Sequence, residues 1–531
     1  MNNNLAIAQS FFNKAIQLHD ENKLEEAIKQ YLVVIKTYPA FGMAYSNLGV
    51  ILQGMERYDE ALDIYSKGAS IVQDYAELHY NYGVLLHHLN KIDEAIISYD
   101  KVTEIDPTYI TAYNNRGVIL HNLDQNDEAL KNFNKALDIN PNYENAYFNR
   151  GNVYAEKRLW ELALTDYNKA IELSPTFFDA HFNKANTLRE LKQFEEAYEL
   201  YEFVTNNIPE LDEAHWNKSY VKLIQGDYEL GFKYYEYRWE YRKMKAIIRN
   251  FKQPKWLGQT SIAGKTLFIY PEQGFGDSLQ FFRYIPLVVQ LGATVIIAVN
   301  KELLGVIPNY ENVTIITDDD SLPDFDYHIP LMSLAMVFKT TINTIPAKIP
   351  YLSIDDDKKK FWADKLGTKT KPRIGLVWSG GFRTTEPDTW QMNERRNIKL
   401  SLLKELNSVD VEYYSLQKGP DSEAQLKELK DNNWGGPTII DYSSEFNSFA
   451  DTGGLIEQLD LVIAVDTSTA HLAAALGKPV WLFNRYDGCW RWHHNRTDSP
   501  WYPTVTIFNQ QIEGEWEPVI QEVVAKLKTM W

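Results

Sequence analysis

The sequence contains a single cysteine, Cys489, among its 531 residues. This scarcity excludes an intramolecular disulfide and a zinc site built on cysteines, and it fits a reducing compartment. Long hydrophobic runs are also missing, because the longest, IPLVVQLGATVIIAV, is broken by Gln290 and Gly292 and is too short to cross a bilayer. The N-terminus has no signal-peptide core and predicts an amphipathic helix. We therefore expect a cytoplasmic protein without a membrane span.

Positive charge is in short supply. The chain has 54 lysines and arginines against 72 acidic residues, a formal net charge of -18. This balance disfavours nucleic acid and anionic membranes as partners, since both need a basic face. A local basic pocket for a phosphate-bearing small molecule stays compatible with it. The length exceeds what one core can hold, and 44% of the residues are apolar, so we expect two to four packed domains.

Internal repetition is the strongest signal in the first half, where a step of 34 residues separates the members of several series. Small residues form two series, at Ala15, Gly49, Gly83, Gly117, Gly151, Ala185 and Ser219, and at Ala27, Ala61, Ala95, Ala129, Ala163, Ala197 and Gly231. Aromatic residues form a third, at Tyr31, Tyr65, Tyr99, Phe133, Tyr167, Tyr201 and Tyr235. Prolines end most units, at Pro39, Pro107, Pro141, Pro175 and Pro209, with Gln73 as the exception.

These series have a common physical explanation. Small residues let two antiparallel helices approach closely, aromatic rings fill the gaps, and proline stops the second helix. The pattern covers about residues 8–245 and resembles the tetratricopeptide repeat (TPR), in seven units. The resemblance implies an α-solenoid, a superhelix of stacked helix pairs with a concave groove.

Asparagines form a further series with the same step. They are Asn13, Asn47, Asn81, Asn115, Asn149, Asn183 and Asn217, one on the first helix of each unit. A ladder of amides can hold an extended peptide by its backbone, because each amide offers donors and an acceptor. The arrangement is similar to the asparagine ladder of the O-linked N-acetylglucosamine transferases, which predicts that it binds an acceptor protein. The alternative is that asparagine at this position is part of the ordinary repeat pattern.

The second half alternates strand-like and helix-like segments. One series begins at KTLFIY and continues through ATVIIAV, NVTIIT and YHIPL, and the other runs from RIGLVWSG to KPVWLFN. The two series predict two doubly wound, Rossmann-like α/β lobes with a cleft between them. We expect a repeat domain over residues 1–245, a linking and packing segment over 246–263, a first lobe over 264–355 and a second over 370–531. The connector between the lobes is polar, and the C-terminal helical segment is a candidate to pack back across both.

A strand followed by Asp466, Thr467 and Ser468 stands out in LDLVIAVDTSTAHLAAALGKPVW. These residues cap a predicted helix that ends near Gly477. The start of a helix offers free N–H groups and the positive end of its dipole, which together suit a phosphate. The alternative is plain helix capping.

The segments GFGDSLQF, GLVWSG, SLQKG, VDTSTAHLAAALGKPVW and DSPWYP resemble the family 9 glycosyltransferases, the heptosyltransferase-like group with the GT-B fold. The resemblance covers about residues 264–531. Repeats joined to such a domain are similar to bacterial TPR glycosyltransferases that modify proteins, flagellins among them. The resemblance to family 9 implies that the diphosphate of a nucleotide-sugar donor is bound by Asp466, Thr467, Ser468 and His471. Ser379 lies in one of the shared segments and is a further candidate for donor binding.

The turn GFGD follows the first strand of the first lobe. Gly274 and Gly276 are expected to let the backbone pass close to a ligand. In the heptosyltransferases the aspartate that matches Asp277 is the proposed general base, and a carboxylate there could take the proton of an acceptor hydroxyl. The alternative is that Asp277 caps its helix, and it could do both.

A departing nucleoside diphosphate needs cations or dipoles nearby. The candidates are Arg383, Arg395, Arg396 and Lys418, of which Arg396 and Lys418 are favoured, and the alternative for each is a surface charge. The loop YDGCWRWHHNRTDSPWYP could shape a donor or acceptor pocket or could simply be packed. The acidic triplets 318–320 and 355–357 are interpreted as solvated loops, and no metal or other cofactor is expected.

Together these observations predict an inverting, metal-independent glycosyltransferase. The repeats would hold an acceptor protein, and the two lobes would transfer a sugar from a nucleotide-sugar donor to a serine or threonine hydroxyl. Two alternatives stay open. One is a transferase directed at a glycan or lipopolysaccharide, and the other is a non-catalytic scaffold with a degenerate transferase domain.

Overall fold

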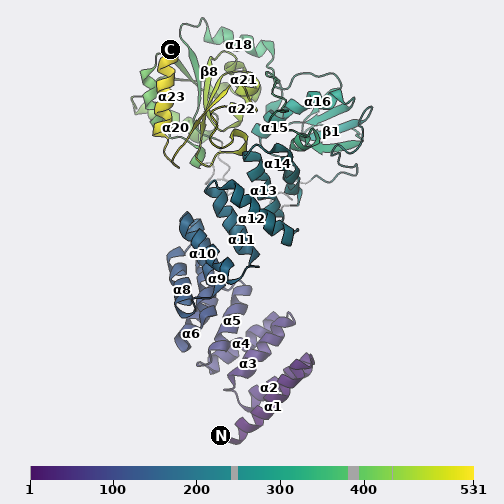
Figure 1. Ribbon diagram of the computed structural model, residues 1–531, viewed down its shortest axis with the longest axis vertical. Coiled ribbons are helices and arrows are strands. Elements are labelled where there is room, and N and C mark those ends of the chain that lie inside the picture. Colours follow the sequence, from purple (N-terminus) through teal and green to yellow (C-terminus); the bar gives the residue numbers. More distant parts are fainter. Residues whose placement is uncertain (1, 241–248, 381–393, 433) are drawn as a thin grey trace. The chain divides into compact units, whose positions relative to one another are not determined.

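A computed structural model describes residues 2–240, 249–380, 394–432 and 434–531. By contacts within the fold, the chain divides into two compact units, one ending at Leu200 and the other running from Tyr201 to Trp531 (Figure 1). The second unit therefore contains the last helix pair of the repeat region as well as the α/β part.

Between Asn2 and Tyr235 the described chain forms fourteen α-helices in seven pairs. Their bounds are α1 Asn2–Asp20, α2 Leu24–Thr37, α3 Gly42–Gly54, α4 Tyr58–Ile71, α5 Ala76–His88, α6 Ile92–Ile105, α7 Ile110–Asn122, α8 Asn126–Ile139, α9 Glu144–Glu156, α10 Trp160–Leu173, α11 Phe178–Glu190, α12 Phe194–Asn207, α13 Asp212–Ile224 and α14 Tyr228–Tyr235. From α3 onward the starts of corresponding helices are 34 residues apart. The predicted helical repeats are confirmed.

Glycine and an aromatic ring pack together inside the helix pairs. In α3 and α4, a Cβ added at Gly49 would lie 2.2 Å from the ring of Tyr65. The same contact recurs in α9 and α10, where the distance from Gly151 to the Tyr167 ring would be 2.8 Å. Both tyrosine rings are buried. The two helices of a pair can approach this closely only because no side chain stands between the glycine backbone and the ring.

Two sheets of parallel strands follow in the second unit. The first has the order β3-β2-β1-β4, with β1 Thr266–Tyr270, β2 Thr294–Ala298, β3 Val313–Ile316 and β4 Tyr327–Pro330. The second has the order β10-β9-β8-β5-β6-β7, with β5 Arg373–Val377, β6 Glu412–Ser415, β7 Ile439–Asp441, β8 Leu461–Val465, β9 Val480–Asn484 and β10 Val505–Asn509. All the pairings between these strands are parallel, as the alternating pattern predicts. The finer assignment to the GT-B fold stays a prediction.

The strand orders carry a functional implication. Renumbered within each sheet, they are 3-2-1-4 and 3-2-1-4-5-6, which is the order of a dinucleotide-type doubly wound sheet and of its first part. In such sheets the order reverses between the first and fourth strands, and ligands bind outside the carboxyl ends of the strands at that point. The two reversal points here lie between β1 and β4 and between β5 and β8.

The helices of the α/β part are α15 Phe275–Phe281, α16 Ile285–Gln290, α17 Leu334–Val337, α18 Asp356–Leu366, α20 Pro420–Asp431, α21 Phe449–Ile456, α22 Ser468–Ala475 and α23 Glu517–Met530. Short 3-10 helices supplement them, among them η1 Glu236–Trp239, η5 Leu331–Ser333, η6 Leu400–Ser408 and η8 Trp490–Trp492. Helix α15 follows the first sheet's β1 and α22 follows the second sheet's β8. The two helices lie side by side (Figure 1).

Three details differ from the expectations. Strand β10 is missing from the predicted series. The polar connector is largely the helix α18, which buries Trp362 against α21. The acidic triplet 355–357 therefore begins a helix and is not a loop, although its residues are exposed as expected. Helix α23 packs on η6 and β10 in the core of the second sheet, where Val523 and Leu527 are buried.

No helix in the described ranges combines the length and the apolar character that a bilayer crossing requires.

Candidate functional site

The carboxyl ends of β5 and β8 form the most promising site, because the second sheet reverses its strand order there. Beyond β8, Thr467 caps α22 as predicted: its side-chain oxygen lies 3.5 Å from the N–H of Ala470. The same hydroxyl donates to the carbonyl of Val465 at 3.1 Å. Asp466, Thr467 and Ser468 are half-buried. The N-terminal end of α22 therefore lies at the reversal point, with its cap held in place.

The loop after β5 is fixed by a residue that the sequence analysis did not single out. Buried Gln417 accepts hydrogen bonds from the N–H groups of Trp378 and Ser379, at 3.2 and 3.1 Å, and donates to the carbonyl of Ser379 at 2.8 Å. The hydroxyl of Ser379 donates to the carbonyl of Gly380. Ser379 thus belongs to the wall of the site, and Gln417 holds that wall. Its place after β6 in SLQKG was the available signal.

The candidate cations lie in different places. Arg396 Nη1 donates to the carbonyl of Asp466 at 3.0 Å, and a Cβ at Gly380 would overlap its guanidinium, so Arg396 lies against the reversal point. Arg395 pairs with Asp487 at 3.0 Å. Lys418 is exposed and donates to the carbonyl of Ser443. Arg383 falls outside the described residues.

Asp277 is both a helix cap and a member of an ion pair. Its Oδ2 accepts the N–H of Gly274 at 3.0 Å, at the start of α15. Its Oδ1 pairs with the guanidinium of Arg491, which η8 carries in the second sheet's part of the unit. Arg491 Nε also donates to Gln280 at 2.7 Å. Burial alone would lower the pKa of Arg491, but Asp277, Cys489 and Tyr235 together outweigh it and raise that pKa above its usual value.

Arg491 is the cation that the sequence analysis missed. It lies inside the aromatic loop, in the segment CWRW, and the sequence analysis considered this loop only for its aromatic residues and histidines. Only the fold brings this loop to α15. Arg491 is 9% exposed and stacks on the ring of Trp490. A buried arginine beside a carboxylate is a strong electrostatic feature, whatever its function.

Gly276 contacts protein rather than open space. A Cβ added there would lie 3.0 Å from the imidazole of His471 and 3.7 Å from the Cα of Ser468. The glycine therefore permits the close approach of α15 to α22. This differs from the expected approach to a ligand, since the side chain of His471 fills the space.

His471 is enclosed and neutral. Its Nδ1 is 2.9 Å from the hydroxyl of Tyr502, and its ring stacks on Trp492. Burial lowers the pKa of His471 to about 4, although Asp466, with Oδ1 3.8 Å from Nε2, opposes the shift. The imidazole is therefore uncharged near neutral pH. It can donate or accept a hydrogen bond but supplies no positive charge for a phosphate.

Asp466 remains ionised in this setting. Burial acts to raise its pKa, but His471, Arg396 and the indole of Trp492 together outweigh it, so the pKa of Asp466 is lowered. The reversal point thus combines a carboxylate, the start of a helix and an arginine.

The aromatic loop packs against the last helix pair. Tyr228 of α14 accepts a hydrogen bond from the indole of Trp501 at 2.8 Å and bonds Nε2 of His493 at 2.5 Å. His493 Nδ1 lies 3.0 Å from the carbonyl of Ile224 in α13. Trp490 is also buried here. This is the packed arrangement that the sequence analysis held as one alternative, with Arg491 as its contribution to the site.

The asparagine series makes regular contacts within the first unit. Asn81, Asn115 and Asn149 each donate to the side chain of the residue 35 positions earlier, Ser46, Tyr80 and Asn114 respectively, at 2.8 to 3.2 Å. Asn47 and Asn183 donate to Tyr31 and Asn152. These bonds link successive helix pairs and use one N–H of each amide.

The exposure of the series is uneven. Asn13 is exposed, Asn47 to Asn183 are half-buried, and Asn217 is buried at 7%. The bonds between helix pairs show that one N–H of each amide has a structural role, which favours the ordinary repeat pattern. The half-buried asparagines keep part of their side chain accessible to a ligand. Peptide binding by the series stays a prediction.

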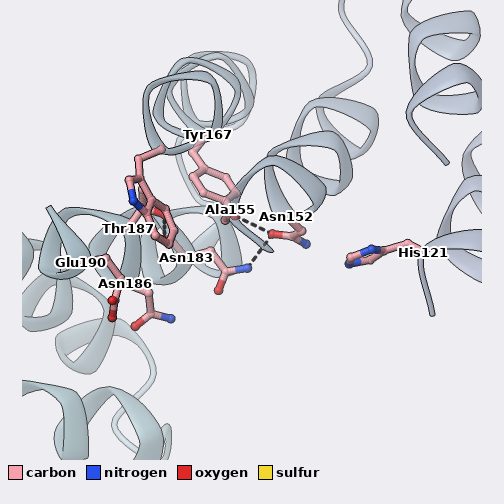
Figure 2. Close-up of a pocket in the computed structure, with 9 residues that line it drawn as sticks. His121, Asn152, Ala155, Tyr167, Asn183, Asn186, Thr187 and Glu190 are labelled. Carbon is pink, nitrogen blue, oxygen red and sulfur yellow. Dashed lines mark hydrogen bonds between the residues drawn. The ribbon is translucent and has the colours of Figure 1, made fainter. Parts of the chain in front are cut away.

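A pocket of about 350 Å³ lies beside Asn183 in the first unit. It is lined by His121, Asn152, Ala155, Trp160, Tyr167, Asn183, Asn186, Thr187 and Glu190. Figure 2 shows Asn152 between Tyr167 and Asn183, and its carbonyl oxygen accepts a hydrogen bond from each at 2.8 Å. The wall of the pocket therefore combines aromatic rings with an ordered amide pair.

In the part of the chain that the structure describes, no three or more histidine, cysteine, aspartate or glutamate side chains are grouped so as to hold a metal ion.

Comparison with known proteins identifies the repeats. Family models described as TPR repeat match residues 85–124 and 123–157, and models described as tetratricopeptide repeat match 42–71, 144–177 and 166–199. The chain contains tetratricopeptide repeats.

Protein FlbA of Caulobacter vibrioides is a relative, 27% identical over an alignment of 305 residues that covers 52% of this chain and 48% of FlbA. The chain thus spans about half the length of this curated relative.

Solved repeat proteins are also similar. YrrB, described as a TPR protein with an unusual peptide-binding site, is 28% identical, covering 32% of this chain and 88% of YrrB with a TM-score of 0.29. A tetratricopeptide repeat protein of Parabacteroides merdae is 18% identical, covering 43% and 91% with a TM-score of 0.36. The repeats that the family models match and the two parallel sheets together make this chain a TPR-containing protein with a C-terminal parallel-sheet part.

Proposed function

We propose that this protein is a glycosyltransferase that moves a sugar from a nucleotide-sugar donor to a serine or threonine hydroxyl of a protein. The observation that carries the proposal is the pairing of two features. The start of α22 lies at the reversal point of the second sheet, and Asp277 of the first sheet's helix pairs with Arg491 beside it. Donor diphosphate and acceptor base would then come from opposite parts of one unit.

The donor would lie at the carboxyl end of β8. Free N–H groups at the start of α22 and the guanidinium of Arg396 can bind a diphosphate there, because both offer donors to an anion. As the bond between the sugar's anomeric carbon and the phosphate oxygen breaks, these groups would stabilise the growing negative charge. His471 is neutral and would act only through hydrogen bonds.

Asp277 would be the general base. The acceptor hydroxyl would give its proton to this carboxylate while its oxygen attacks the anomeric carbon from the face opposite the diphosphate, inverting that centre. Each oxygen of Asp277 already accepts one hydrogen bond, from Gly274 or Arg491. A carboxylate oxygen has a second lone pair, so the hydroxyl can still bind. The repeats would hold the acceptor chain, with the asparagine series and the pocket near Asn183 as candidate contacts.

A non-catalytic scaffold is the second candidate, and one observation favours it. The ion pair with Arg491 already occupies Oδ1 of Asp277, so an acceptor hydroxyl has to share this carboxylate with a buried guanidinium. If the pair persists in solution with a donor bound, the repeats would be the working part of the protein.

Donor binding and turnover distinguish the two candidates. UDP-, GDP-, ADP-, CMP- and TDP-sugars are titrated by calorimetry into the wild type, Thr467→Ala, and Thr529→Ala as a control on the exposed end of α23. We expect one nucleotide class to bind, and Thr467→Ala alone to weaken it. Asp277→Asn should keep donor affinity and lose about 100-fold or more in release of the nucleoside diphosphate. No binding by the wild type would favour the scaffold.

A further inference from the structure

The connector between β1 and α15, residues 271–274, is held by the last helix pair of the repeats. Arg238 of η1, which directly follows α14, is fully buried. Its Nη2 pairs with Oε1 of Glu272 at 2.9 Å, and the side chain of Glu272 is also buried, at 1% exposure. Gln273 of the connector donates to the hydroxyl of Tyr235 in α14 at 2.6 Å. Arg238 and Tyr235, at the end of the repeats, thus both bind the connector.

The same guanidinium reaches the end of β4. Arg238 Nη2 donates to the hydroxyl of Ser333 in η5 at 2.8 Å, and Ser333 donates to Oε1 of Glu236 at 2.7 Å. Glu272 Oε1 accepts the N–H of Met332 at 3.3 Å. Arg238 therefore occupies the reversal point of the first sheet, between the ends of β1 and β4. A protein side chain occupies the place where a doubly wound sheet would otherwise bind a ligand.

The arginine is well suited to this place. Nη1 donates to the carbonyl of Tyr235 at 3.0 Å and to Glu236 at 2.6 Å, while Nη2 serves Glu272 and Ser333. One planar fork thus joins four groups from α14, η1, the connector and η5. A lysine at this position would keep the charge but could not reproduce the fork.

We propose that Arg238 and Tyr235 are positioning residues for Asp277. The connector that they hold ends at Gly274, whose N–H is bonded to Asp277, so its placement sets the placement of that carboxylate. The last helix pair is therefore part of the transferase unit itself. A catalytic meaning for this arrangement rests on the proposed function, but the mechanical coupling does not.

Hydrogen exchange tests the coupling without reference to activity. Full-length wild type and Arg238→Lys are compared below their unfolding temperatures, with Arg496→Lys as the control. Arg496 is a half-buried arginine, with 37% of its side chain exposed, that pairs with Asp498 through two of its nitrogens. We expect the peptide covering residues 271–281 to exchange at least tenfold faster in Arg238→Lys alone, while the start of α22 is unchanged. Unchanged exchange at 271–281 would overturn the proposal.

Turnover supplies the second readout. In Arg238→Lys we expect release of nucleoside diphosphate to slow tenfold or more, with donor affinity within twofold of the wild type, because the donor would bind at the second sheet. Tyr235→Phe should give a smaller loss of the same kind. Faster exchange together with an unchanged turnover number would overturn the positioning role. Absence of donor binding in the wild type would instead count against the proposed function and leave the exchange result standing.

Discussion

Glu272 makes the stability of the second unit depend on pH. The groups that face it are Arg238 and Glu236 of η1, Tyr235 of α14, Asp277 of α15, Tyr270 of β1 and Lys255. Two glutamates share one arginine in a buried place. Burial raises the pKa of Glu272 from 4.5 to about 7, with Arg238 opposing the shift and Glu236 adding to it.

The sign and size of the effect follow from this shift. Between pH 4.5 and pH 7 the folded state holds the proton of Glu272 while the unfolded state releases it. The contribution of Glu272 to the free energy of unfolding therefore falls as pH rises through this window, because ionisation is costlier in the folded state. At 1.36 kcal/mol per pKa unit, the loss between pH 4.5 and pH 8 is roughly 3 kcal/mol.

Glu272→Gln removes this loss because glutamine cannot ionise. We expect the stability of the variant, relative to wild type, to improve by roughly 3 kcal/mol between pH 4.5 and pH 8, whatever its offset at low pH. The unit from Tyr201 to Trp531 holds 331 residues. Its unfolding entropy is then about 0.7 kcal/mol/K, and the relative shift in Tm is about 4 to 5 °C.

Scanning calorimetry at pH 5, 6, 7 and 8 measures the shift. Glu405→Gln, an exposed substitution on η6, is the matched control and should give a constant difference from wild type. If the difference for Glu272→Gln is also constant across this range, the pKa of Glu272 is not raised, and the buried arrangement of Glu272 and Glu236 around Arg238 is wrong.

Three further predictions concern other parts of the fold. Gly151→Ala should destabilise the first unit by about 1–3 kcal/mol in urea unfolding, because the added Cβ would press on the Tyr167 ring. Gly54→Ala, whose added Cβ would have no atom within 4 Å, should be neutral or stabilising, and equal effects of the two substitutions would contradict this packing. Trp362→Ala should cost about 3–5 kcal/mol in the second unit, measured by denaturant unfolding, and a loss under 1 kcal/mol would show that α18 is not packed as described. Burial lowers the pKa of His471 to about 4, so the contribution of His471 to stability rises with pH between about 4 and 6.5, where only the unfolded state is protonated. This rise opposes the fall that Glu272 contributes, so it is measured as the difference between wild type and His471→Asn in urea titrations across this range. A difference that does not change with pH would refute it.

The sequence by itself determined the local architecture. The 34-residue step fixes the helix pairs, since a glycine and an aromatic ring sixteen residues later can pack only if two helices lie antiparallel. Nine of the described strands follow from apolar runs between turn residues, and the cap at Thr467 follows from a hydroxyl after such a run. These are local rules, so short stretches of chain suffice to express them.

Tertiary structure decided what the local rules leave open. The residues that turn the chain between paired helices adopt positive φ, near 60°, even where they are Glu56, Arg158 and Lys192, because the packing of the pair outweighs the strain. The partners of Asp277 and Glu272 could not be predicted either. Arg491 is 214 residues from Asp277, and Glu272 follows β1, beyond the repeats that end near Arg238, so the repeat pattern predicts neither pair. Only the folded unit brings these charges together, because burial, rather than sequence spacing, makes their pairing necessary.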